Sequence, residues 1–280
     1  MLYTKLTRDN HPEVCLTTYV MDAIPGMIGG EVRPAVVVCP GGGYRFLSPR
    51  EAENMAIWFT AQGFHAFVLE YSIAPDSGYQ EAKKILGKEP LMDLSWAVST
   101  IREHAQEWNV DPDKIAIMGS SAGGHLAVTL GVFWNDPEIV ETLGIREGSN
   151  RPNALILNYT PVVSNERLHP GSYRKIYGDD KTEEEYAALS LERYVGDHTP
   201  PCFMWHTVED EKVPVEHPLL FALALRRHNI PFEVHVFEKG KHGLSTCQAD
   251  VAGSPEGINP DVGKWKELCL NFLRRHFDMK

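Results

Sequence analysis

The chain has 280 residues, of which 43% are hydrophobic and 10% aromatic, and its formal net charge is -11. This length and apolar content permit one large α/β domain with a sizeable core. The acidic balance argues against proteins that bind nucleic acid or an anionic membrane through a basic surface, so we expect neither partner.

The N-terminus and the cysteines indicate the compartment. Residues 1–8 turn polar at once, and the sequence has no apolar run long enough to cross a bilayer, so we expect neither a signal peptide nor a membrane span. The cysteines are odd in number and lack CxxC spacing, which favours reduced thiols in a cytoplasmic protein. They are Cys15, Cys39, Cys202, Cys247 and Cys269.

Strands and helices alternate along the chain. Short, largely apolar runs of five to nine residues indicate strands, and longer runs with one apolar face indicate helices. The expected strands are 13–21, 34–39, 64–71, 114–118, 154–159, 202–206 and 232–237, and the expected helices are 50–62, 90–108, 215–228 and 262–277. This order predicts a mostly parallel sheet with helices on both faces. The first strands have no helix between them, so we expect antiparallel pairing at one edge.

The absence of a linker signature predicts a single domain over residues 1–280. Residues 164–197 interrupt the alternation with a polar stretch that holds one short helix. This stretch is either a small lid or an excursion, and its low apolar content favours the excursion.

Gly119-Ser120-Ser121-Ala122-Gly123 follows an apolar strand directly, and a helix of small residues begins after it. This G-x-S-x-G order predicts a sharp turn that lifts the Ser121 hydroxyl above the sheet edge. The helix N-terminus then points N–H groups at whatever Ser121 attacks. Ser121 is therefore the candidate nucleophile.

A serine nucleophile needs a base and an acid that orients the base. His242 lies in a glycine-flanked loop after the last strand and is the candidate base. Asp210 follows the preceding strand and is the candidate acid, with Glu209 as the alternative. We expect His206 and His125 to have structural roles.

Negative charge on the acyl intermediate requires N–H donors. The backbone of Ala122 and the glycines Gly41-Gly42-Gly43 after the strand 34–39 can supply them. The glycines do not form a phosphate cradle, because the Lys-Ser/Thr of a P-loop and a G-x-G-x-x-G spacing are missing.

Four motifs together resemble the α/β-hydrolase superfamily, and more narrowly the bacterial esterase/lipase group that includes acetyl esterases and acetylxylan esterases. They are Pro40 to Tyr44, Gly119 to Ala127, His206 to Pro214 and Glu238 to Gly243. One departure is Pro40, because the hormone-sensitive-lipase-like pattern has His before the three glycines.

The resemblance implies an α/β-hydrolase fold with little or no cap, and no metal or cofactor. It implies a catalytic triad of Ser121, Asp210 and His242, and an oxyanion hole made by the backbone of Gly42, Gly43 and Ala122. It also marks Asp93 as a structural residue that braces the glycine loop.

The expected activity is a serine carboxylesterase acting on short-chain acyl esters, with acetyl esters of sugars or xylo-oligosaccharides as the favoured substrates. Two alternatives stay open, an amide-cleaving hydrolase with the same triad and a non-catalytic ligand-binding homologue. The sequence leaves open whether copies of the chain form a homo-oligomer. Candidate substrate-binding residues are Tyr44 and Arg45, with Phe46, Tyr71 and Trp205 as further rim candidates.

Overall fold

The computed structural model describes residues 1–280 except 28, 75–84, 165–175, 179–180 and 280. The described residues form one eight-stranded sheet in the order β1-β2-β4-β3-β5-β6-β7-β8. The strands are β1 (Lys5–Arg8), β2 (His11–Tyr19), β3 (Arg33–Cys39), β4 (His65–Glu70), β5 (Val110–Ser120), β6 (Ala154–Asn158), β7 (Cys202–Thr207) and β8 (Phe232–Phe237).

The sheet is parallel from β4 through β8, and β1 and β2 add an antiparallel edge. The expected mostly parallel sheet and its antiparallel edge are confirmed. The edge was incompletely predicted, because β1 was missed and β2 pairs with β1 and β4. β1 has only four residues, alternately exposed and half-buried, so it carries little apolar signal.

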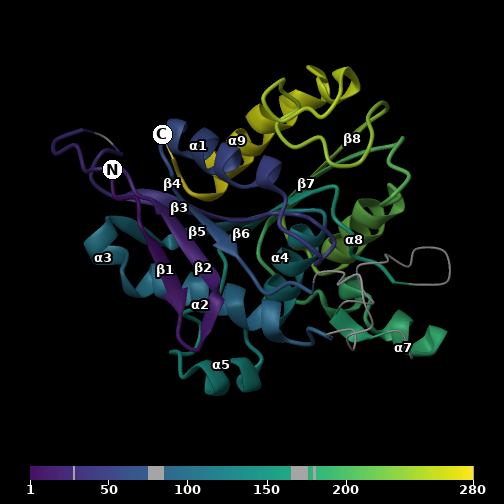
Figure 1. Ribbon diagram of the computed structural model, residues 1–280, viewed down its shortest axis with the longest axis horizontal. Coiled ribbons are helices and arrows are strands. Elements are labelled where there is room, and N and C mark those ends of the chain that lie inside the picture. Colours follow the sequence, from purple (N-terminus) through teal and green to yellow (C-terminus); the bar gives the residue numbers. More distant parts are fainter. Residues whose placement is uncertain (28, 75–84, 165–175, 179–180, 280) are drawn as a thin grey trace.

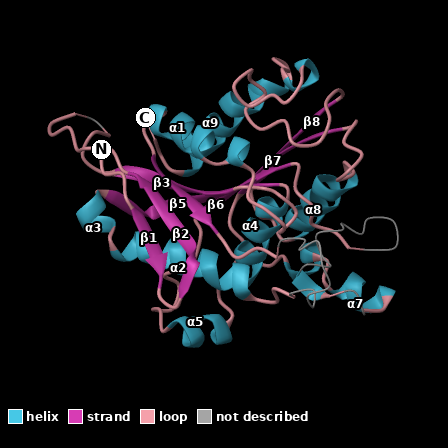
Figure 2. Ribbon diagram, in the orientation of Figure 1, coloured by secondary structure: helices cyan, strands magenta, loops and turns pink. Residues whose placement is uncertain are grey.

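Helices cover both faces of the sheet (Figures 1 and 2). One face carries α1 (Glu53–Ala61) and α9 (Trp265–His276), and the other carries α2 (Glu89–Glu103), α4 (Ala122–Phe133) and α8 (Glu216–Arg227). The smaller helices are α3 (Ala105–Trp108), α5 (Pro137–Leu143) and α7 (Glu183–Ala188), with 3-10 turns η1 (Pro49–Glu51), η2 (Leu191–Tyr194), η3 (Pro255–Gly257) and η4 (Val262–Lys264).

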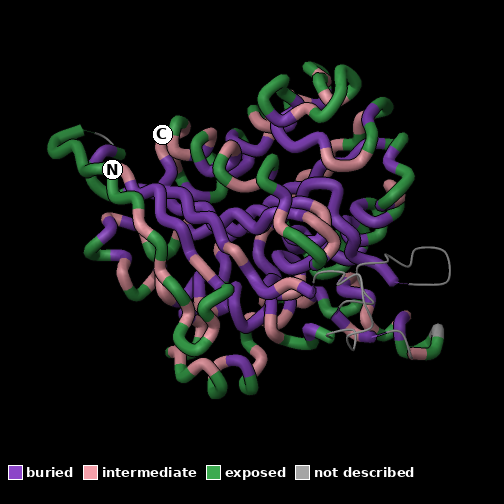
Figure 3. Tube along the Cα trace, viewed as in Figure 1, coloured by how far each residue is buried: buried purple, intermediate pink, exposed green. Residues whose placement is uncertain are grey.

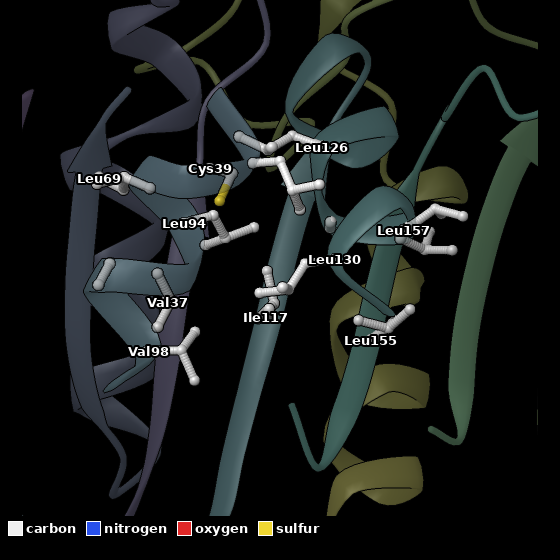
Figure 4. Packing of buried hydrophobic residues seen from close by; sticks show 14 of the residues in the cluster. Val37, Cys39, Leu69, Leu94, Val98, Ile117, Leu126, Leu130, Leu155 and Leu157 are labelled. Carbon is white, nitrogen blue, oxygen red and sulfur yellow. The ribbon is translucent and has the colours of Figure 1, made fainter. Parts of the chain in front are cut away.

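Alternate residues of the central strands enter opposite cores. In β3, Val37 packs toward α2 and α4, whereas Val36 and Val38 pack toward α1 and α9. β5 repeats this two-residue period, with Ile117 on the first face and Met118 on the second. Figure 4 shows the first core, where Leu94 and Leu130 of the helices meet Val37, Ile117 and Leu155 of the strands. β3, β6 and the second half of β5 are buried (Figure 3), which explains their continuous apolar runs.

Two local expectations need correction. The helix expected at 90–108 is broken at His104, whose ring stacks on Trp108 with centroids 4.5 Å apart. Asp93 is fully buried but accepts hydrogen bonds from the Ser72 N–H and the Arg8 guanidinium. It therefore braces the end of β4 and β1, and not the glycine loop.

The cysteines are all free thiols, and four of the five are buried. Among the described residues, no helix combines the length and apolar content needed to cross a membrane.

Candidate active site

Ser121 occupies the turn between β5 and α4 with φ 52° and ψ -119°. This left-handed conformation is uncommon for a residue with a side chain. Small neighbours make the turn close-packed. A Cβ added to Gly123 would lie 2.0 Å from the Cys39 carbonyl oxygen, and one added to Gly119 would lie 2.2 Å from the Gly123 carbonyl oxygen. The glycines therefore let strand and helix meet at the serine.

The structure brings Ser121, His242 and Asp210 together from three loops. The Ser121 Oγ lies 2.8 Å from His242 Nε2, and His242 Nδ1 lies 2.6 Å from Asp210 Oδ2. The loops follow β5, β7 and β8 at the same edge of the sheet, because parallel strands end on the same side. The Asp210 side chain is fully buried, whereas that of His242 is 14% exposed.

The surroundings of Asp210 favour its charged form. Its Oδ1 accepts the backbone N–H groups of Lys212 and Val213 at 3.0 and 2.9 Å. Burial raises the pKa of Asp210, but the hydrogen bond from His242 and the contact with Val213 outweigh it, so the pKa lies below its usual value. A carboxylate at Oδ2 requires the proton on His242 Nδ1, which leaves Nε2 free to accept from Ser121.

Glu209, the alternative acid, points elsewhere. Its carboxylate accepts from the Lys239 ammonium at 2.9 Å and from the Gly240 N–H at 3.0 Å. It therefore ties the Asp210 loop to the His242 loop without contacting the imidazole.

His206 and His125 lie in buried positions, as expected of structural residues. His206 Nε2 donates to the Val213 carbonyl at 2.7 Å, and His125 Nδ1 lies 2.8 Å from the Tyr44 hydroxyl. Burial lowers the pKa of both histidines, to about 3 for His125, so both are neutral at pH 7.

The glycine loop lies against the nucleophile. A Cβ added to Gly41 would lie 3.1 Å from the Ser121 Cβ. Gly42 has φ 130°, and a Cβ there would lie 1.9 Å from the Phe46 carbonyl oxygen, so no other residue fits. Gly43 has φ 64°, and Ala122 is the first residue of α4. The three residues expected to donate N–H groups therefore lie on the two segments that meet at Ser121.

An apolar cavity of about 410 Å³ adjoins these segments and is lined by Tyr44 and His125. Neither Ser121 nor His242 is among its described lining residues, so it lies beside the serine rather than around it. Described residues of the stretch 164–197, among them Ile176, Leu189 and Leu191, contribute to its wall, although the sequence indicated little apolar surface there. Further lining residues are Leu91, Leu126 and Phe133.

The rim candidates divide into buried and exposed residues. Tyr44, Tyr71 and Trp205 are each 1% exposed, so they belong to the core or to the cavity wall and do not form a rim. Arg45 and Phe46 are exposed on the glycine loop.

Glu51 and Tyr159 were not selected from the sequence, yet they pack beside the site. Glu51 accepts the Gly41 N–H at 2.8 Å and the Tyr159 hydroxyl at 2.6 Å. The ring of Tyr159 stands edge-on to His242, with centroids 5.1 Å apart. The sequence offers no signal that separates buried Glu51 from exposed Glu53 two residues later. Across the described chain, no three His, Cys, Asp or Glu side chains are grouped to hold a metal ion.

Comparison with known proteins agrees with this fold. Residues 24–225 match the BD-FAE family. The chain belongs to the BD-FAE family. This BD-FAE chain is 41% identical over 220 residues to endo-1,4-beta-xylanase B of Butyrivibrio fibrisolvens. The aligned region covers 77% of this chain and 33% of the xylanase. It spans less than half the length of the curated relatives it matches.

Solved structures resemble the BD-FAE chain over nearly its full length. The α/β hydrolase MGS-M1, from a Medee basin deep-sea metagenome library, has a TM-score of 0.77 and 35% identity, covering 100% of this chain and 99% of that one. The acetyl ester-xyloside bifunctional hydrolase of Caldicellulosiruptor lactoaceticus has a TM-score of 0.75 and 32% identity, covering 94% and 88%. The α/β-hydrolase fold and the resemblance to bacterial esterases are confirmed.

Proposed function

We propose that this BD-FAE protein is a serine carboxylesterase that hydrolyses short-chain acyl esters. The observation that carries the proposal is the chain of two hydrogen bonds from the Ser121 hydroxyl through His242 to Asp210, at 2.8 and 2.6 Å. A serine hydroxyl becomes nucleophilic when a base accepts its proton, and an oriented imidazole is suited to that role.

The reaction has two stages in this proposal. The Ser121 Oγ attacks the ester carbonyl while His242 Nε2 takes the hydroxyl proton, and Asp210 stabilises the imidazolium. His242 then gives that proton to the departing alcohol, which leaves an acyl group on Ser121. A water molecule, deprotonated by His242, attacks the acyl-enzyme and releases the acid and the free serine.

The negative oxygen of each tetrahedral intermediate needs donors. We assign this role to the backbone N–H groups of Gly42, Gly43 and Ala122, which lie on the two segments that meet at Ser121. In comparable sites, removing one such donor lowers kcat by about 10²- to 10³-fold.

We further propose acetyl esters of sugars or xylo-oligosaccharides as the substrates. The support is the chemistry printed in the names of similar proteins, an endo-1,4-beta-xylanase and an acetyl ester-xyloside bifunctional hydrolase. The net charge of -11 would repel a polyanionic substrate, whereas an uncharged small-molecule or oligosaccharide ester meets no such repulsion.

Hydrolysis of p-nitrophenyl acetate tests the activity. Ser121→Ala should lower kcat by at least about 10³-fold with an unchanged melting temperature, because the nucleophile is lost. Ser254→Ala, at an exposed serine, is the matched control and should retain full turnover. Turnover retained by Ser121→Ala would refute the proposal.

A panel of p-nitrophenyl esters and acetylated xylo-oligosaccharides tests the substrate. We expect kcat/KM to be highest for acetyl and to fall with chain length. A preference for acyl chains of eight carbons or more would contradict the proposal. Faster cleavage of p-nitroacetanilide than of p-nitrophenyl acetate would favour the amide-cleaving alternative.

A further inference from the structure

Glu51 is a buried acid that the proposed reaction does not use. It is 3% exposed and ends the η1 turn. A carboxylate is costly to bury unless its oxygens accept hydrogen bonds. Glu51 meets this requirement with one donor on each oxygen, the Gly41 N–H on Oε2 and the Tyr159 hydroxyl on Oε1.

The first of these contacts clamps a single peptide plane. The N–H of the Pro40–Gly41 peptide donates to Glu51 at 2.8 Å, and its carbonyl accepts from the Tyr71 hydroxyl at 2.6 Å. Tyr71 is also buried. This plane therefore cannot rotate without breaking two buried hydrogen bonds. The Gly41 carbonyl, on the next peptide, accepts the Ser48 N–H at 2.9 Å and closes the loop.

The next two peptide planes, which carry the Gly42 and Gly43 N–H groups, continue from this one. Each is also held by its carbonyl, since the Gly41 carbonyl accepts from Ser48 and the Gly42 carbonyl accepts the Arg45 N–H at 3.1 Å. Gly42 and Gly43 have positive φ and no side chains that could hold them. Their N–H groups are useful for catalysis only when they are preorganised toward the oxyanion. The clamp on the Pro40–Gly41 peptide supplies the fixed point from which both glycines continue.

The second contact reaches the base. Tyr159 donates to Glu51, accepts the Ser245 N–H at 3.2 Å, and places its ring edge against His242. Burial and the nearby Glu51 charge raise the pKa of Tyr159 well above its usual value, so it stays a donor. One carboxylate thus joins the glycine loop, the end of β6 and the loop that carries His242.

We propose that Glu51 is a positioning residue that holds the Pro40–Gly41 peptide, and with it the Gly42 and Gly43 N–H groups, in the orientation that stabilises the oxyanion. The inference rests on the proposed esterase function. It predicts that Glu51 contributes to transition-state binding and little to substrate binding.

Steady-state kinetics with p-nitrophenyl acetate test this role. Glu51→Ala should lower kcat by roughly 10²-fold, the effect of losing one oxyanion donor, with KM changed less than about threefold. Glu51→Gln should lose less than about tenfold, because its amide oxygen can still accept the Gly41 N–H. Tyr71→Phe, which releases the other end of the clamp, should lower kcat in the same way.

Glu53→Gln is the matched control, because Glu53 lies two residues away and bonds the Tyr19 hydroxyl at 3.1 Å away from the site. It should match wild type. A short-chain trifluoromethyl ketone forms an oxyanion when it adds to the serine. Its binding affinity is a second measurement, which a partly misfolded sample alone would not change. Its affinity should fall in parallel with kcat/KM across the Glu51 and Tyr71 variants.

Two results would overturn the inference while leaving the esterase proposal intact. One is a kcat within threefold of wild type for Glu51→Ala and Tyr71→Phe, with Ser121→Ala inactive. The other is a rise in KM with unchanged ketone affinity. If Glu51→Ala does not fold, Tyr71→Phe carries the same comparison. A wild-type protein inactive on every ester would refute the esterase proposal, and the inference with it.

Discussion

His206 lies beneath Asp210, with its Nε2 3.5 Å from the same Oδ2 oxygen that His242 contacts. The closer partner of His206 is the Val213 carbonyl, and the Val213 N–H in turn donates to Asp210. The turn from Asp210 to Val213 is therefore held by the hydrogen bond from His206 and by its own hydrogen bond from the Val213 N–H to Asp210. This arrangement leaves one carboxylate oxygen, Oδ2, aimed at the imidazole of His242.

The first prediction separates the two neighbouring acids. Asp210→Asn should lower kcat on the order of 10³- to 10⁴-fold, because an amide facing His242 Nδ1 favours the wrong tautomer. Glu209→Gln is the matched change and should lower kcat less than about tenfold, since Glu209 hydrogen-bonds to Lys239 and Gly240 and not to His242 among the described residues. Equal losses in the two variants, measured with p-nitrophenyl acetate, would contradict the assignment.

The second prediction concerns acid stability. Burial and the charge of Arg33 lower the pKa of His65 to about 4, and burial lowers that of His217 to about 3. In the unfolded chain both histidines have a pKa of about 6.5. Below that pH the unfolded state therefore binds more protons than the folded state. The free energy of unfolding should therefore be highest above pH 6.5 and fall as the pH drops toward 4, by at most about 1.4 kcal/mol per pH unit for each histidine.

Urea unfolding at pH 7, 6 and 5 measures this slope. His65→Gln should show a shallower fall between pH 6.5 and 4 than wild type. Esterase activity at pH 7 should be unchanged, because His65 begins β4 and so lies at the end of the strand opposite the catalytic loops. Identical slopes for the two proteins would show that His65 does not titrate as expected.

The third prediction concerns the tight junction behind Ser121. Gly123→Ala should destabilise the fold by about 3 kcal/mol or more, because the new Cβ would meet backbone of β3 that cannot move aside. Gly144→Ala is the control. Gly144 needs glycine for a different reason, its φ of +62°, and has nothing within 4 Å of the new Cβ, so only the backbone penalty of about 1 kcal/mol applies. Thermal or urea unfolding compares them, and similar losses would argue against the close contact.

Much of the fold was predictable because burial of the central strands leaves a local trace. The stretches 35–39 and 115–118 are apolar at every position, since each residue enters one of two cores. G-x-S-x-G was equally readable, because a tight turn restricts its own residues. The edge strand β1 and the break at His104 were missed, because short or half-exposed elements carry weak periodicity.

The sequence by itself determined which residue types could do the chemistry and the order in which they follow the strands. Only the tertiary structure decided that Asp210 rather than Glu209 meets His242, that Glu51 is buried while Glu53 is exposed, and that Tyr44 lines a cavity. The physical reason is that a side chain's identity is local, whereas its direction and burial depend on strands far apart in the chain. Residues 121, 210 and 242 become neighbours only when sheet register and crossovers bring the ends of β5, β7 and β8 together.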